Sequence, residues 1–184
     1  PVLLIRGPYG QSAEFVTEAR RWAGRGYVFV YQDVRGRYDS EGLFYPYVFE
    51  ANDGFDTQQW IAKQSWSNSK IGTLGASYLG TTQWMTAPLN SPALVAMAPG
   101  ISPLHYYRDV AYPGGAFRLA NRIGWGNAIN GRTHQQITYD WPTLIWHLPL
   151  QTMDDALGVK LPHGQDWIAH PSYDAYWEKL NIEA

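Results

Sequence analysis

The segment IGTLGASYLGTTQW, residues 71–84, places a serine where it could act as a nucleophile. Ser77 follows a short apolar run and precedes a helix-like stretch, with Gly75 before it and Gly80 after it. A strand, a tight turn and a helix form the context of a nucleophile elbow, in which a strained turn projects the serine hydroxyl above the carboxyl edge of a sheet. The N–H of Tyr78 would then lie at a helix N-terminus, where free donors and the helix dipole favour a negative oxygen. This pattern predicts acyl-transfer chemistry.

The motif is not specific by itself. The usual pattern is G-x-S-x-G, whereas this chain has G-A-S-Y-L-G, with the second glycine one position later. A serine in an ordinary strand-to-helix turn is the alternative. The strand before Ser77, the helix after it and two similar units upstream favour a nucleophile.

The elements that would position this turn alternate along the first 103 residues. We expect four strands, at 2–7, 26–33, 71–75 and 93–99. We expect three helices between them: one that begins after the N-cap Ser12 and ends at Gly24, and two at 52–64 and 78–87. Strands that alternate with helices predict the α/β class, with a parallel, doubly wound sheet.

The pattern changes after Pro103, where no alternation of strand and helix continues. Three helix-like segments, at about 115–130, 133–147 and 172–180, indicate a mainly helical layer. We therefore expect two domains, a partial α/β core over 1–103 and a helical cap over 104–184.

Composition excludes several functions. The chain has 184 residues, a net charge of −2 and no cysteine, so thiolate catalysis and Cys-ligated zinc are excluded, and nucleic acid is not an expected partner. No apolar run approaches the roughly 20 residues that a membrane span needs. The nine Trp and 13 Tyr indicate large aromatic cores, or an aromatic pocket for an organic substrate.

Several ordered motifs resemble one family. GASYLGTTQW (75–84) resembles the nucleophile segment of the X-Pro dipeptidyl-peptidase and cocaine esterase family, the CocE/NonD-type α/β-hydrolases, in which the elbow is written G-x-S-Y-x-G. LLIRGPYG (3–10) is similar to the oxyanion loop of that family, and GYVFVYQDVRGRYDSEGLF (26–44) to its QD-x-RG…SEG segment. YPGGAF (112–117) and IGWGNAI (123–129) resemble the start of its helical cap.

The resemblance implies roles for particular residues. Ser77 would be the acylated nucleophile, and the oxyanion would be held by the backbone N–H of Tyr78 and the phenol of Tyr9. Tyr9 could instead be an aromatic plug at the end of the first strand. Trp125 would line the acyl pocket, or would pack within the cap. In the QD-x-RG…SEG segment, three charged residues are expected to be structural: Asp33 as an acceptor for loop amides, Arg35 as a clamp on a carboxylate, and Glu41.

A serine nucleophile needs a base, and the base needs an acid that orients it. The family places both after the cap, so the resemblance implies that they lie outside these residues. All five histidines lie beyond the fourth expected strand: His105, His134, His147, His163 and His170. The best internal pair would be Asp140 with His147, which a helix would place on one face, although Trp141-Pro142 interrupts it. No metal-ligand spacing occurs, and no cofactor is implied.

We therefore predict a serine esterase or acylase that acts on a small organic ester or amide. The alternatives are an X-Pro dipeptidyl-peptidase-like aminopeptidase and a non-catalytic α/β-hydrolase-like module. Because a strand pattern begins at Pro1 without a lead-in, we expect the sequence to be part of a longer protein. The remainder of that protein could be a separate chain that binds this one as a partner. The compartment stays undecided between cytoplasm and a secreted or periplasmic location.

Overall fold

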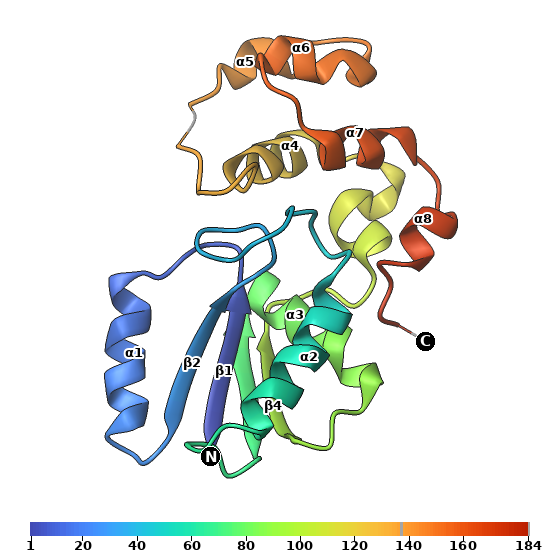
Figure 1. The fold of residues 1–184 in the computed structure, drawn as a ribbon. Coiled ribbons are helices and arrows are strands. Elements are labelled where there is room, and N and C mark those ends of the chain that lie inside the picture. Colours follow the sequence, from blue (N-terminus) through green and yellow to red (C-terminus); the bar gives the residue numbers. More distant parts are fainter. Residues whose placement is uncertain (137, 184) are drawn as a thin grey trace. The chain divides into compact units, whose positions relative to one another are not determined.

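The computed structural model describes residues 1–136 and 138–183, and the chain divides into two compact units. The first unit is Pro1–Pro103 and the second begins at Leu104 (Figure 1). Among the residues described, no helix combines the length and the apolar character that crossing a bilayer requires.

The first unit is built on a four-stranded parallel sheet with the order β2-β1-β3-β4. Its strands are β1 (Val2–Gly7), β2 (Val28–Asp33), β3 (Ile71–Ala76) and β4 (Leu94–Gly100). Each predicted strand is found, with bounds that differ by at most two residues at either end. Parallel neighbours require crossover connections, which the intervening helices provide.

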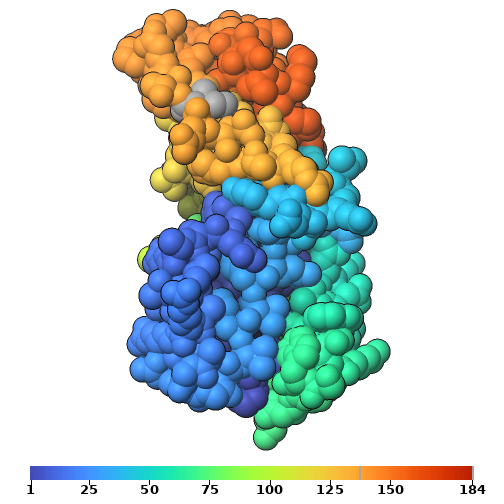
Figure 2. All heavy atoms as spheres, turned by 60° about the vertical axis from the view of Figure 1, so that its left-hand side comes forward, coloured from blue at the N-terminus to red at the C-terminus, as the bar shows by residue number. Residues whose placement is uncertain are grey.

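Helices cover both faces of this sheet. They are α1 (Ala13–Ala23), α2 (Glu50–Ala62) and α3 (Tyr78–Thr86), the last followed by a 3₁₀ turn at Ala87–Leu89. On one face, Phe15 of α1 packs against Tyr31 of β2 with ring centroids 4.7 Å apart. The outer side of α1 is open to solvent (Figure 2). The prediction of a doubly wound sheet is confirmed, and so is the N-cap Ser12, whose hydroxyl accepts from the Phe15 N–H at 3.4 Å.

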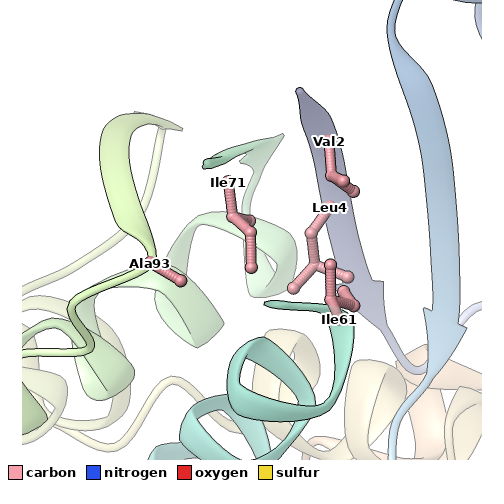
Figure 3. Close-up of a cluster of buried hydrophobic side chains, with 5 residues drawn as sticks. All are labelled: Val2, Leu4, Ile61, Ile71 and Ala93. Carbon is pink, nitrogen blue, oxygen red and sulfur yellow. The ribbon is translucent and has the colours of Figure 1, made fainter. Parts of the chain in front are cut away.

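The opposite face carries the aliphatic core of the first unit. Ile61 of α2 packs there against two alternate residues of β1 and against β3, with Ala93 completing the cluster (Figure 3). The members are Val2, Leu4, Ile61, Ile71 and Ala93, all less than 5% exposed. The alternation of Val2 and Leu4 fixes which face of β1 meets α2, and with it the register of the sheet.

Among the residues that the structure describes, the regular elements of the second unit are short helices and helical turns joined by loops. Its helices are α4 (Leu119–Ala128), α5 (Trp141–Leu144), α6 (Met153–Leu157), α7 (Pro162–Ala169) and α8 (Ala175–Glu178). A π-helical turn lies at Tyr107–Ala111, and 3₁₀ turns lie at Pro113–Gly115 and Leu150–Thr152. One cluster of its apolar core consists of Ile123, Leu144, Met153, Leu161 and Ile168.

One predicted helix of this unit is wrong. The sequence predicts a helix over 133–147, but the described residues of this segment, 133–136 and 138–147, contain only the four-residue α5 at Trp141–Leu144, and residue 137 lies outside the described part of the chain. Pro142 lies in the first turn of this helix, where its fixed φ is tolerated. A longer helix that began near residue 133 would place Pro142 in its interior, where proline lacks the N–H that a helical hydrogen bond needs. The sequence prediction also missed α7, which begins with Pro162 in the same way.

Candidate active site

Ser77 occupies the turn between β3 and α3 in a strained backbone conformation. Its φ is 59° and its ψ is −126°, a combination that is costly for a residue with a Cβ, at about 1–3 kcal/mol. Its side chain is exposed and makes no capping hydrogen bond to α3. A strained serine between a strand and a helix, with a hydroxyl that does not cap that helix, has the geometry of a nucleophile elbow.

Backbone hydrogen bonds fix the Ser77 turn on both sides. The Ser77 N–H donates to the Gly100 carbonyl of β4 at 2.9 Å, so the sheet ladder continues through the turn. The Ser77 carbonyl accepts from the N–H groups of Gly80 and Thr81, at 2.9 and 3.0 Å. The peptide groups of Ser77 are therefore held, while its hydroxyl stays at the surface.

The two glycines of the motif are required by close packing. Gly75 has a φ of +136°, and a Cβ on it would lie 2.5 Å from the Leu79 Cβ. A Cβ on Gly80 would lie 2.6 Å from the Ser102 Oγ and 2.9 Å from the Gly100 carbonyl oxygen. Because Gly80 packs against the end of β4, its position one residue later than in G-x-S-x-G suits this turn.

The residue after the serine is anchored by its side chain. The Tyr78 phenol is buried, donates to the Glu50 Oε1 at 2.7 Å and accepts from the Tyr47 N–H at 3.0 Å. Burial raises the pKa of Tyr78 well above its ordinary value, so the phenol stays protonated. The Tyr78 N–H opens α3, where helical amides point outwards along the axis and favour negative charge.

Glu50 links this anchor to the sheet. Its carboxylate pairs with the Arg6 Nη2 at 3.1 Å, and both side chains are less than 5% exposed. Arg6 also donates to the Glu50 carbonyl at 3.0 Å and to the Gln32 Oε1 at 2.7 Å. Burial raises the pKa of Glu50, and the Arg6 charge opposes that rise. Sequence reasoning missed Arg6 and Glu50, although a charged residue in the apolar run VLLIRG was a signal.

Tyr9 lies at the same edge of the sheet as Ser77. β1 and β3 are parallel neighbours, with Val2 opposite Ile71 and Leu4 opposite Thr73. The carboxyl ends of neighbouring parallel strands meet at one edge, so the loop after β1, which contains Tyr9, and the turn after β3 share that edge. Tyr9 is half-buried.

The charged residues of the QD-x-RG…SEG segment lie in the loop after β2. Arg35 forms a two-pronged ion pair with Asp53 of α2, with its Nε 2.9 Å from one carboxylate oxygen. Burial and the Asp39 charge raise the pKa of Asp33, whereas backbone hydrogen bonds from Asp39 and Gly10 lower it. The Glu41 carbonyl accepts from the Gly36 N–H at 2.8 Å. Asp33 and Arg35 thus make the kinds of contact that were expected of them.

Trp125 lies on α4 in the second unit and is half-buried. Its ring stacks on Trp167 with centroids 6.2 Å apart, and the Arg122 guanidinium lies 5.0 Å from its centroid. These contacts give Trp125 a packing role within the second unit. A substrate-binding role for it stays a prediction.

The first unit contains no histidine, because all five lie beyond Leu104. The Nε2 of His163 bonds to the Gly126 carbonyl at 3.1 Å, and His170 Nδ1 lies 2.6 Å from Asp174 Oδ2. Asp140 accepts from the Thr143 hydroxyl at 2.7 Å, and His147 Nε2 lies 2.8 Å from the Thr152 hydroxyl.

Asp140 and His147 do not lie on one helical face, because α5 begins after Asp140 and ends at Leu144; this pairing is not supported. As for metal ions, over residues 1–136 and 138–183 no group of three His, Asp or Glu side chains could hold one.

Comparison with known proteins identifies the family. The model of the X-Pro dipeptidyl-peptidase (S15) family matches residues 1–184, the whole chain. The chain belongs to this family. The chain is 40% identical over 135 residues to the cocaine esterase of Rhodococcus sp. (strain MB1 Bresler). The aligned residues make up 70% of this chain and 24% of that protein. The resemblance drawn from the motifs is confirmed.

Solved structures support the fold. An alpha-amino acid ester hydrolase matches 99% of this S15 family chain, with a TM-score of 0.80 and a sequence identity of 26%. A CocE/NonD family hydrolase from Staphylococcus aureus also matches 99% of the chain, with a TM-score of 0.75 and a sequence identity of 27%. The α/β-hydrolase prediction is therefore confirmed. The chain spans about a quarter of the cocaine esterase and about a third of these two structures, at 35% and 33%.

Proposed function

We propose that this chain carries the nucleophile and oxyanion donors of a serine hydrolase. In the first step, the Ser77 Oγ attacks the carbonyl carbon of an ester or amide, and its proton passes to a base. The base then protonates the leaving alcohol or amine, and an acyl-enzyme remains at Ser77. Water, deprotonated by the same base, releases the acid and restores the serine hydroxyl.

The observation that carries this proposal is the strained, exposed Ser77 between β3 and α3. A φ of 59° at a non-glycine residue is retained only where its surroundings impose it, and such residues concentrate at functional sites. The anchoring of Tyr78 by Glu50 supports the same interpretation.

The tetrahedral oxyanion would be held by two donors, the Tyr78 N–H and the Tyr9 hydroxyl. Each donor of this kind is worth about 10²–10³-fold in kcat when it is preorganised at the oxyanion position. The base and its orienting acid are assigned to residues outside this chain, either later in the same polypeptide or on a separate one. No cofactor takes part in this scheme.

The substrate class that we favour is a small organic ester. Two of the similar proteins are named for ester cleavage, the cocaine esterase and the alpha-amino acid ester hydrolase. The family description favours a second candidate, an aminopeptidase that cleaves after X-Pro. Comparing kcat/KM for a p-nitrophenyl ester and for an X-Pro p-nitroanilide, in the intact protein, would distinguish the two. Trp125→Ala would alter the preference among acyl groups if Trp125 lines the acyl pocket.

Covalent labelling tests the proposal itself. A fluorophosphonate probe should modify the intact protein at Ser77, as peptide mass spectrometry would locate, and Ser77→Ala should remove both the adduct and the esterase activity. Ser102→Ala offers a matched control, because Ser102 lies near the same turn and packs against Gly80. An intact protein that does not react with the probe, and whose behaviour Ser77→Ala leaves unchanged, would show that the proposal is wrong. If that protein also has no esterase activity, it is a non-catalytic module.

A further inference from the structure

The loop that contains Tyr9 is hydrogen-bonded to the segment that follows β2. The Val34 N–H donates to the Gly7 carbonyl at 3.0 Å, which extends the pairing of β1 and β2 by one step. One residue further along the first loop, the Arg37 Nε donates to the Pro8 carbonyl at 2.8 Å. The peptide group that precedes Tyr9 is therefore held by a guanidinium.

Arg37 is fully buried, with 0% of its side chain exposed. Its guanidinium lies 5.3 Å from the ring centroids of both Tyr38 and Phe44, which flank it. Burial lowers the pKa of Arg37, and the neighbouring groups Tyr38 and Asp33 oppose that effect. Burying a cation costs several kcal/mol, so a guanidinium kept at this position has to be offset by the contacts it makes.

The residue after Tyr9 is also restrained. Gly10 has a φ of +79°, and a Cβ on it would lie 2.5 Å from the Tyr38 ring. Its N–H faces the Asp33 carboxylate and lowers the pKa of that group as a backbone donor. Tyr9 is thus bracketed by two residues that the 33–38 segment holds in place, while its own side chain stays half-buried.

From this arrangement we propose that Arg37 is a positioning residue for Tyr9, fixing the Pro8 carbonyl so that the phenol is aimed at the oxyanion. The inference rests on the proposed function. An oxyanion donor acts only when it lies about 2.7–3.1 Å from the developing charge, and a displacement of 1 Å costs on the order of 10²-fold in rate. The hydrogen bond from Arg37 restrains the Pro8 carbonyl, and movement of this peptide group would displace the Tyr9 phenol.

A double-mutant cycle in the intact protein tests this assignment. Arg37→Met alone should lower kcat for a p-nitrophenyl ester by about 10- to 100-fold, with KM changed by less than about threefold, because the ground-state contacts remain. In a Tyr9→Phe background, the same substitution should cost less than about threefold, since the hydroxyl it positions is already absent. A merely structural role for Arg37 would make the two effects multiply.

Arg35→Met is the matched control. Arg35 lies two residues from Arg37, and it pairs with Asp53 of α2. Arg35→Met should therefore change kcat only slightly, and the change should be the same in the Tyr9→Phe background. If Arg37→Met does not fold, Arg37→Lys takes its place. Lysine keeps the buried charge but lacks the planar guanidinium whose Nε donates to the Pro8 carbonyl, so it should show the same coupling to Tyr9.

The outcomes separate the two proposals. Multiplying effects in the cycle, or a Tyr9→Phe variant with unchanged kcat, would overturn the role of Arg37 while fluorophosphonate labelling of Ser77 still stood. Loss of the proposed function would instead appear as absence of labelling in the wild-type protein.

Discussion

Acidification is expected to destabilise the helical unit through His163, in the first turn of α7. His163 is 3% exposed, and its ring packs against Trp167 with centroids 5.0 Å apart. Its Nε2 donates to the Gly126 carbonyl at 3.1 Å, since a carbonyl can only accept. Burial lowers the pKa of His163 from the ordinary 6.5 to about 4, because the imidazolium would lose its hydration. The Gly126 carbonyl and the carboxylates of Asp166 and Asp154 oppose this fall.

The sign of the effect follows from this depressed pKa. Between pH 6.5 and about 4 the unfolded chain binds a proton at this histidine and the folded chain does not, so the free energy of unfolding falls as the pH falls through that window. Each tenfold change in proton affinity is worth about 1.4 kcal/mol. The full change at His163 is therefore about 3 kcal/mol, a large part of the 5–15 kcal/mol that is typical of a folded domain.

Urea unfolding of the wild-type protein and of His163→Gln, followed by tryptophan fluorescence from pH 4 to pH 7.5, would measure this term. Glutamine can still donate to the Gly126 carbonyl and does not titrate. All other acids and bases are common to both proteins, so the difference between their unfolding free energies should change by about 3 kcal/mol across the window. A difference that stays constant with pH would refute the reasoning.

Two further predictions concern the turn at Ser77. Ser77→Gly should have a free energy of unfolding about 1 kcal/mol higher than Ser77→Ala, because glycine adopts a φ of 59° without a clash at Cβ; equal urea midpoints would mean that the turn stores no strain. Tyr78→Phe should lower the free energy of unfolding by about 2 kcal/mol, because it removes a hydrogen bond to the buried Glu50 carboxylate. Tyr173→Phe provides the control, because Tyr173 is 42% exposed. In thermal unfolding, its free energy of unfolding should change by less than about 0.5 kcal/mol.

The sheet and the turn at Ser77 could be predicted because their signals are local. Apolar strands bounded by glycine and polar loops, and a small-residue turn between strand and helix, are visible within about ten residues of sequence. The second unit was harder to predict. Its helices are short, α5 and α8 having four residues each, and a period of 3.6 cannot be distinguished from other patterns over one turn.

The supports of the site could not be predicted, since their contacts join distant parts of the chain. Arg6 meets Glu50 across 44 residues and Arg37 meets Pro8 across 29. Only the folded sheet brings these segments together, by pairing β1 with β2 and with β3. An arginine in an apolar strand marks a residue that needs a partner, but the sequence does not identify that partner.

The two residues to which we assign chemistry are supported in the same way. Ser77 is exposed and Tyr9 is half-buried. In each case a flanking residue is anchored by a buried charged group: Tyr78 by Glu50 beside the serine, and Pro8 by Arg37 beside the tyrosine. Both anchors use a buried charged group, whose removal leaves polar groups without their partners and costs more than the contact itself is worth. Substitutions at Glu50 and Arg37 should therefore lower the rate through the backbone of the site, and their effects should depend on the hydroxyls of Ser77 and Tyr9.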